Sequence, residues 1–323
     1  MISSDTDRLL EEYGDRLFRR RRASDGLPML AMRSDAVRRE VRAVVRRAPQ
    51  VMVKVTGGGR GMGAIKAHMA YISKRGSLEV EDQEGERHKG REAIKDLARE
   101  WSHAGTHIPE VSHRREAFNI ILSMPRKTEA AVVRAAAREF MREEFKGYRY
   151  AMVLHEHQEN PHVHVVVRAE RDDGHRLNPR KADLHRWRER FAAALRSYGI
   201  EAAATRQAVR GVMQRPDLLW ERVARAEGRL KRERAPIREE SLMPASDEAL
   251  ANWSQLGRVL AASPHPEDRA LAGEVERFLS SAPVFARRMS VRHSRSDRSE
   301  GSRETKERAP SDGRAPDAQG PER

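Results

Sequence analysis

Hydrophobic residues in the middle of the chain follow the two spacings that distinguish strands from helices. Short apolar runs of the β type are separated by longer segments in which apolar residues recur every three or four positions. The pattern predicts strands at 51–56, 77–82, 116–125, 148–157 and 162–170. It predicts helices at 64–76, 91–105, 128–147 and 181–199, the first ending at Gly76 and the third capped by Thr128. This order is typical of an α+β fold with a central antiparallel sheet, flanking helices and a hairpin formed by the last two strands.

The pattern changes on both sides of this domain, which we expect to occupy residues 49–212. Residues 1–48 contain arginine-rich segments with helical spacing, divided by "SDGLP", and predict a basic helical extension. Residues 213–287 carry leucines at helical spacing between proline-containing breaks, which predicts a helical region. Residues 288–323 have almost no apolar side chains, so they cannot bury enough surface to fold and predict a disordered tail.

Charge narrows the class of partner. Lys and Arg number 63 against 49 Asp and Glu in 323 residues, and this excess favours a polyanion, with nucleic acid ahead of an anionic membrane surface. We find no apolar run that could span a bilayer and no secretory leader, so we expect a soluble, cytoplasmic protein without membrane insertion. Cysteine is absent, which excludes disulfides, thiolate catalysis and cysteine-bound zinc. Any metal must bind to histidines and carboxylates.

Four of the 13 histidines fall within "HEHQENPHVH" at 155–164. On a strand, His162 and His164 project from one face while the valines between and after them project from the other. His155 ends the preceding strand, and an antiparallel turn of this length can bring it alongside. Three neutral imidazoles with open coordination positions predict a catalytic divalent-metal site. A chance cluster is the alternative, but His-x-His on a valine-rich strand after a proline and a third histidine favours the metal.

A basic chain with a metal site favours a phosphodiester as the electrophile. With no cysteine and no Gly-x-Ser-x-Gly sequence, the nucleophile is water or one of five tyrosines. Tyr71 is distinctive because it lies beside the predicted core stripe of its helix, on a stripe with His68 and two alanines. From spacing alone, the edge of an amphipathic helix explains Tyr71 better than catalysis does.

Two segments together, "VKVTGGGRGMGAIKAHMAYISKRGSLEVED" and "HEHQENPHVHVVV", resemble the relaxases of conjugative and mobilisable elements. The resemblance is to the branch of the HUH endonucleases that includes the T-DNA border nickase, and it covers about residues 50–212. It implies an HUH relaxase-like fold, Tyr71 as nucleophile, and Mg²⁺ or Mn²⁺ bound by the three histidines of the predicted metal site. The strand "NIILSMP" matches the middle motif of the family and implies a DNA contact by Ser123.

One position departs from the familiar motif. The family usually has Asp two residues after the first histidine, and here His157 occupies that place. The base or supporting role of that acid therefore passes to His157 itself, to Glu156, to Glu159 or to another acid.

The chemistry implied by the resemblance is transesterification. The phenolic oxygen of Tyr71 displaces a 3′-hydroxyl and leaves a 5′-phosphotyrosine, so rejoining needs no ATP. "GGGRGMGAIK" agrees with this, because it lacks the Gly-Lys-Ser/Thr of a nucleotide-binding P-loop. These glycines predict close approach to DNA or to backbone, or a plain tight turn. Four cations are candidate phosphate contacts, although a solvated basic face explains each one equally well: Arg60, Lys66, Lys74 and Arg75.

As partners the resemblance implies single-stranded and supercoiled origin DNA, accessory relaxosome proteins and a type IV secretion coupling protein. It also implies transfer of the protein with its DNA into a recipient cell, and the tail fits either a secretion signal or a solubilising segment. Two alternatives stay open. One is a rolling-circle replication initiator, in which the histidine motif usually precedes the tyrosine, opposite to the order here. The other is a non-catalytic, metal-containing DNA-binding accessory protein.

Overall fold

The computed structural model describes residues 2–18, 27–156, 160–212, 219–230, 232 and 239–289. Contacts divide the chain into two compact units. One contains the described residues from 27 to 206, and the other contains those up to 18 and from 207 onward. The domain boundaries expected after residues 48, 212 and 287 stay predictions.

The larger unit is built on one six-stranded sheet in the order β1-β4-β6-β5-β2-β3, with every neighbouring pair antiparallel. The strands are β1 Met52–Gly57, β2 Val80–Asp82, β3 Arg87–His88, β4 Ala117–Ser123, β5 Tyr150–His155 and β6 His162–Arg168. The helices are α2 Leu27–Val45, α3 Met62–Ile72, α4 Arg91–His103, α5 Ala130–Glu144 and α6 Lys181–Ser197. The predicted α+β fold with a central antiparallel sheet is confirmed.

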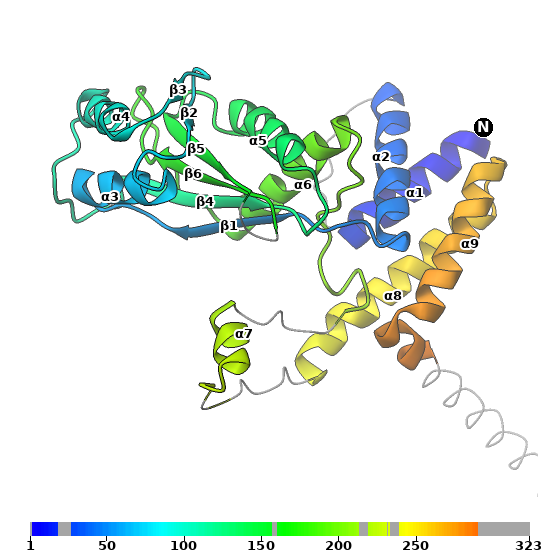
Figure 1. Ribbon diagram of the computed structural model, residues 1–323. Coiled ribbons are helices and arrows are strands. Elements are labelled where there is room, and N and C mark those ends of the chain that lie inside the picture. The colour runs from blue at the N-terminus through cyan, green and yellow to red at the C-terminus, as the bar shows by residue number, and fades with distance from the viewer. Residues whose placement is uncertain are drawn as a thin grey trace, which may run out of the picture. The chain divides into compact units, whose positions relative to one another are not determined.

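Two helix layers cover the sheet, α3 and α4 on one face and α5 and α6 on the other (Figure 1). Successive side chains of β6 point alternately toward the two helix layers. Val163, Val165 and Val167 pack in the core beneath α5 and α6, as predicted. Val166 packs with α3 and α4, so the face that carries His162 and His164 is covered by helices as well.

Register brings three polar residues into one row across the sheet. His162 on β6 pairs with Ser123 on β4 and with His155 on β5. His164 is two residues further along β6 and projects from the same face. Residues from three separated parts of the sequence therefore meet at one end of the sheet.

Two local predictions were wrong, and one short strand was missed. The helix predicted to run to Gly76 ends at Ile72, because the Ser73 hydroxyl accepts the Gly76 N–H at 3.1 Å and the Ser73 carbonyl accepts the Leu78 N–H at 2.9 Å. Thr128 does not cap α5, since its hydroxyl donates to the Pro125 carbonyl at 3.0 Å and α5 begins after Glu129. The two-residue strand β3 had no predicted counterpart, because it is too short to show a period.

The glycine-rich loop before α3 packs against protein backbone. A Cβ on Gly58 would lie 2.1 Å from the Ala117 carbonyl oxygen, and one on Gly61 would lie 2.4 Å from that of Glu110. The first N–H groups of α3 are also occupied, since Met62 donates to Pro109 and Gly63 to Glu110. Of the roles considered for these glycines, close approach to backbone is the one present here.

The second unit consists of helices α1 Ile2–Phe18, α7 Leu219–Ala226, α8 Glu239–Ala261 and α9 Pro266–Ser281. Trp253 of α8 lies at its core, with its ring centroid 6.4 Å from that of Phe18 and 5.3 Å from that of Phe278. Its indole N–H donates to the Val209 carbonyl at 2.8 Å. The predicted C-terminal helical region is confirmed, whereas nearly all of the predicted disordered tail lies outside the described residues. Within the described helices none is both long and apolar enough to cross a bilayer.

Candidate active site

The three histidines predicted to converge do so. Their ring centroids lie 4.5 to 5.1 Å apart, and each ring offers a nitrogen within 4.8 Å of those of the other two. His155 and His162 are buried, with 6% and 7% of their surfaces exposed, and His164 is half-buried. Such a group of imidazoles is consistent with binding of a divalent metal.

Backbone carbonyls orient two of the rings. His155 Nε2 lies 2.6 Å from the Ile72 carbonyl oxygen, and His162 Nδ1 lies 2.9 Å from that of Asn160. A carbonyl can only accept, so in the neutral rings these nitrogens carry the protons, while Nδ1 of His155 and Nε2 of His162 carry the lone pairs. Metal-binding histidines typically donate their other N–H in this way. The donor set therefore fits a metal.

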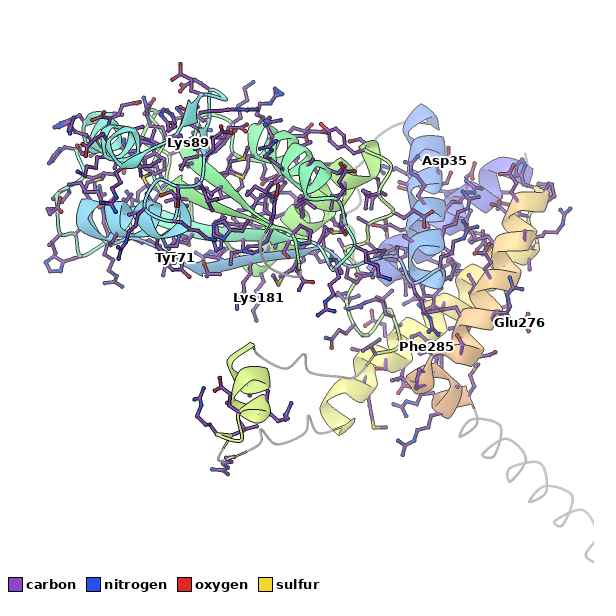
Figure 2. All side chains as sticks on the ribbon, viewed as in Figure 1. Asp35, Tyr71, Lys89, Lys181, Glu276 and Phe285 are labelled. Carbon is purple, nitrogen blue, oxygen red and sulfur yellow. The ribbon has the colours of Figure 1, made fainter. Side chains whose placement is uncertain are left out.

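Tyr71 stands at the surface near the end of α3 (Figure 2), with 71% of its surface exposed. The predicted core stripe of this helix, which includes Ile65, Met69 and Ile72, is buried. Tyr71 immediately precedes Ile72, whose carbonyl oxygen contacts His155. The backbone thus places an accessible phenol one residue from a contact of the histidine cluster.

The other four tyrosines do not belong to this site, because they lie on the opposite face of the sheet or in the other compact unit. Tyr148 and Tyr150 pack in the core beneath α5 and α6, and Tyr198 follows α6, so these three belong to the opposite face of the sheet. Burial raises the pKa of both Tyr148 and Tyr150, the latter to about 12, which disfavours the phenolate. Tyr13 belongs to the other compact unit.

His68 is a residue of this site to which the sequence pattern assigned no role. Its ring stacks on that of Tyr71, with centroids 6.1 Å apart and an interplanar angle of 29°. Burial lowers the pKa of His68 below its usual 6.5, so the ring is neutral near pH 7. The i,i+3 spacing was the available signal, because residues three apart are neighbours on a helix surface.

The chain after α3 is held in an unusual backbone conformation. Lys74 and Arg75 both have positive φ, 48° and 58°. Consecutive non-glycine residues in this region cost on the order of 1 to 3 kcal/mol each. Both side chains are exposed, and they belong to the basic residues predicted to contact phosphate.

Two other predicted phosphate contacts already have partners in the protein. Arg60 donates to the His113 carbonyl at 3.1 Å, and Lys66 pairs with Glu110 at 2.9 Å. Both lie on exposed surface, where ion pairs are weak and exchangeable. Their DNA contacts stay predictions.

Ser123 is buried, and its hydroxyl donates to the Pro161 carbonyl at 3.2 Å. It also lies opposite His162 in the sheet. A hydroxyl in this position supports the segment that leads into the histidine strand. The DNA contact implied for Ser123 stays a prediction.

Three residues are candidates for the base that accompanies the site. His157 and Glu159 lie outside the described residues, and Glu156 is exposed next to His155. Each of the three remains a candidate for the role of the acid that the motif usually contains.

An antiparallel sheet that presents three histidines on the face covered by a tyrosine-bearing helix has the features of an HUH-like nuclease site. Comparison with known proteins finds a family with a similar domain. Residues 71–200 match the relaxase family described as MobA/VirD2-like, nuclease domain. This part of the chain, which begins at Tyr71 and contains all three histidines, is similar to the nuclease domain of MobA/VirD2-like relaxases, as the resemblance predicted.

Similarity to individual relatives is distant and partial. The chain is 30% identical over 189 residues to the T-DNA border endonuclease VirD2 of Agrobacterium fabrum strain C58, with 52% of this chain and 42% of that protein covered. Identity to the same endonuclease is 30% for Rhizobium rhizogenes and 29% for Rhizobium radiobacter, covering 43% and 44% of those proteins. The matched region thus spans less than half the length of these relatives.

Proposed function

We propose that this protein nicks and rejoins one strand of DNA at a specific transfer origin and thereby initiates conjugative or mobilisation transfer. The observation that carries the proposal is the exposed Tyr71, which precedes the Ile72 carbonyl that contacts a largely buried cluster of three histidines, in a region similar to relaxase nuclease domains. The reaction proceeds through a covalent 5′-phosphotyrosine intermediate.

In this proposal His155, His162 and His164 hold a divalent metal, Mg²⁺ or Mn²⁺. When bound, the metal supplies positive charge that polarises a non-bridging oxygen of the scissile phosphate. The carbonyls of Ile72 and Asn160 keep the rings of His155 and His162 in the tautomers that direct a lone pair to the ion.

Tyr71 performs the covalent step. Its phenolic oxygen forms a bond to phosphorus as the bond from phosphorus to the 3′-oxygen breaks. The phenolic proton passes to a base, and the leaving 3′-oxygen takes up a proton to become the hydroxyl. His157, Glu156 and Glu159 are the candidates for that base. Attack by the same 3′-hydroxyl on the phosphotyrosine reverses the step and reseals the strand.

The partners follow from the proposed reaction. The substrate is single-stranded or supercoiled origin DNA, and accessory relaxosome proteins and a type IV secretion coupling protein deliver the adduct to a recipient cell. The excess of Lys and Arg supports an anionic substrate.

Covalent adduct formation tests the proposal. The protein is incubated with Mg²⁺ or Mn²⁺ and a supercoiled plasmid that carries a candidate origin, and the complex is denatured in SDS. We expect a nicked plasmid whose 5′ end is attached to a peptide that contains Tyr71. Nicking without a covalent adduct would indicate water as the nucleophile, and binding without nicking would indicate an accessory DNA-binding protein.

A rolling-circle initiator would also form the adduct, so transfer distinguishes it. Cells carrying the origin on a mobilisable plasmid should deliver that plasmid to recipients only when the protein is present. Replication of the plasmid without its transfer would favour the initiator.

A further inference from the structure

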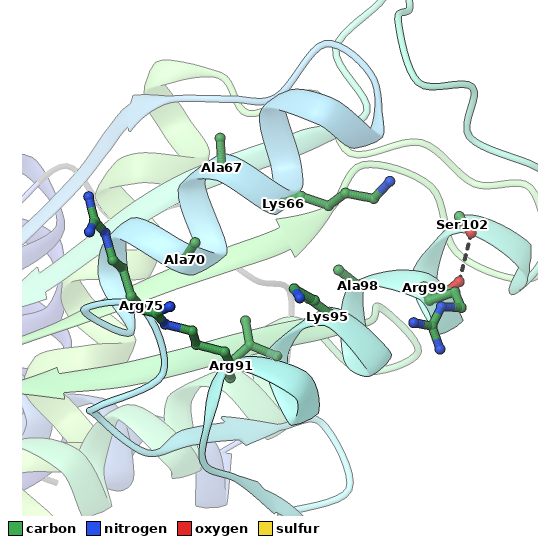
Figure 3. A pocket seen from close by; sticks show the side chains of 10 residues that line it. Lys66, Ala67, Ala70, Arg75, Arg91, Lys95, Ala98, Arg99 and Ser102 are labelled. Carbon is green, nitrogen blue, oxygen red and sulfur yellow. Dashed lines mark hydrogen bonds between the residues drawn. The ribbon is translucent and has the colours of Figure 1, made fainter.

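A pocket of about 720 Å³ lies between α3 and α4 (Figure 3). Its lining combines a floor of small or apolar side chains with a cationic rim, and no acidic residue is among the lining residues. The floor residues are Ala67, Ala70, Ile94 and Ala98, and the rim cations are Lys66, Arg75, Arg91, Lys95 and Arg99. Ser102 completes the lining.

The rim cations are not equivalent. Three of them have acidic partners, since Lys66 pairs with Glu110, Lys95 with Glu92 and Arg99 with Asp96, at 2.7 to 2.9 Å. Among the residues that the structure describes, no acidic side chain pairs with Arg75 or Arg91. Two uncompensated guanidinium groups favour binding of an anion from solution.

Two glycines bring these arginines to the same end of the pocket (Figure 3). The Gly90 N–H donates to the Gly76 carbonyl at 2.9 Å, and a Cβ on Gly76 would lie 2.5 Å from the carbonyl carbon of Gly90. This close contact joins the segment after α3 to the start of α4. It therefore fixes Arg75, which precedes Gly76, beside Arg91, which follows Gly90.

The pocket adjoins the proposed nucleophile. Ala70 of the floor directly precedes Tyr71, and Ala67 lies one helical turn before it. A strand bound to Tyr71 can therefore reach the pocket by crossing the surface of α3.

We propose that this pocket holds one nucleotide of the single-stranded DNA next to the nick, an inference that rests on the proposed function. The phosphate pairs with Arg75 and Arg91, and the base lies on the floor formed by Ala67, Ala70 and Ile94. A free phosphate would need only the two arginines, whereas the apolar floor also suits a nucleotide base. A base can reach this floor only when it is unstacked from its neighbours. The pocket thus selects single-stranded over duplex DNA.

Charge on the rim is tested with Arg91→Ala. Its control is Arg87→Ala, which removes the same charge from exposed strand β3 outside the pocket. Binding of fluorescent dT20 is followed by anisotropy from 50 to 300 mM salt. Loss of one phosphate contact should weaken binding and reduce the slope of log K against log salt by about 0.7, whereas the control should keep the wild-type slope. Equal slopes for the two variants would overturn the phosphate contact.

The floor is tested with Ala70→Leu, which narrows the pocket. The control is Ala131→Leu, the same change at an exposed position of α5. Each protein is titrated with dT20 and with an abasic strand of the same length. Ala70→Leu should lower the preference for dT20 by about threefold or more, because stacking of a base is a sizeable part of single-strand affinity. An unchanged preference would overturn the base site and leave only a phosphate contact.

The adduct assay separates this inference from the proposed function. If the wild-type protein forms the adduct but Arg91→Ala and Ala70→Leu behave like their controls, the nucleotide site is contradicted and the proposed nicking function is supported. If no adduct forms but both variants show the expected losses, binding of single-stranded DNA in the pocket is supported and the proposed nicking function is contradicted.

Discussion

His155 on β5 donates through Nε2 to the carbonyl oxygen of Ile72, the last residue of α3, at 2.6 Å. The two residues are 83 positions apart in the sequence, and the bond joins the histidine cluster to the helix that carries Tyr71. It fixes the orientation of the imidazole and the position of the end of the helix together. Precise placement of a nucleophile relative to a metal site is a large source of rate enhancement in enzymes.

Tyr71→Phe should bind single-stranded origin DNA nearly as the wild type does and form no covalent adduct. Only the hydroxyl is lost from an exposed side chain, so we expect a fall in nicking rate on the order of 10⁴-fold or more with little change in affinity. The measurement is SDS-resistant adduct against time. Tyr198→Phe, a second partly exposed tyrosine, serves as the control and should nick normally. An adduct formed by Tyr71→Phe would assign the nucleophile to another residue.

Single His→Ala changes at 155, 162 or 164 should weaken metal binding and nicking together. Imidazole binds metal as the neutral ring, so protons compete with the ion and affinity should also fall at lower pH. Calorimetric titration with Mn²⁺ at pH 7.5 and 5.5 measures both effects. The exposed His113→Ala is the control and should match the wild type. An absence of divalent-metal binding by the wild type would eliminate the site.

The sequence predicted the sheet, its hairpin and the convergence of the histidines, because each depends on a local period or on one short turn. The stripe of α3 that contains Tyr71 was also predictable from helical spacing. The pocket between α3 and α4 was not predicted, since it depends on the contact between Gly76 and Gly90. A signal for it was present in the spacing of Arg91, Lys95 and Arg99, which recur every four residues and therefore share one face of α4.

The wrong helix end has a similar cause. Ser73, Lys74 and Arg75 are compatible with a helix by propensity, and Gly76 is a common terminator. Hydrogen bonds of Ser73 with Gly76 and Leu78 end the helix earlier and turn the chain toward β2. Such competition between side-chain and helical hydrogen bonds does not appear in a hydrophobic pattern.

Ser123→Ala should lower the free energy of unfolding by about 1 kcal/mol. The change removes the hydroxyl that donates to the Pro161 carbonyl and leaves that carbonyl without this buried donor. Urea denaturation measures the loss, and Ser77→Ala, which removes an exposed hydroxyl, should cost less. If Ser123 contacts DNA instead of supporting the hairpin, its variant will lose DNA affinity without losing stability.

The ion pair between Glu81 of β2 and Arg138 of α5 should be a large contributor to the stability of the sheet edge. Glu81 is buried and takes two hydrogen bonds from the guanidinium, one of them at 2.6 Å. Arg138→Ala leaves that carboxylate without its partner and should cost roughly 2 to 4 kcal/mol, somewhat below a fully buried pair because Arg138 is one-third exposed. The control Lys95→Ala breaks an exposed pair with Glu92 and should cost at most about 1 kcal/mol. Similar losses for the two variants, measured by urea denaturation, would contradict this account.

His68 should make stability depend on pH. Burial lowers its pKa below the usual 6.5 in the folded protein, so between that lowered value and 6.5 the unfolded chain binds the proton more readily. The contribution of the neutral ring is therefore complete above about pH 6.5 and is lost as the pH falls toward the folded pKa. His68→Phe keeps a ring against Tyr71 but cannot take up the proton, so its unfolding free energy should fall less between pH 7.5 and 5.5 than that of the wild type. Urea denaturation at both pH values measures the difference, with His113→Phe as an exposed control that should retain the wild-type dependence. An identical pH dependence for His68→Phe and the wild type would show that His68 is not the residue responsible.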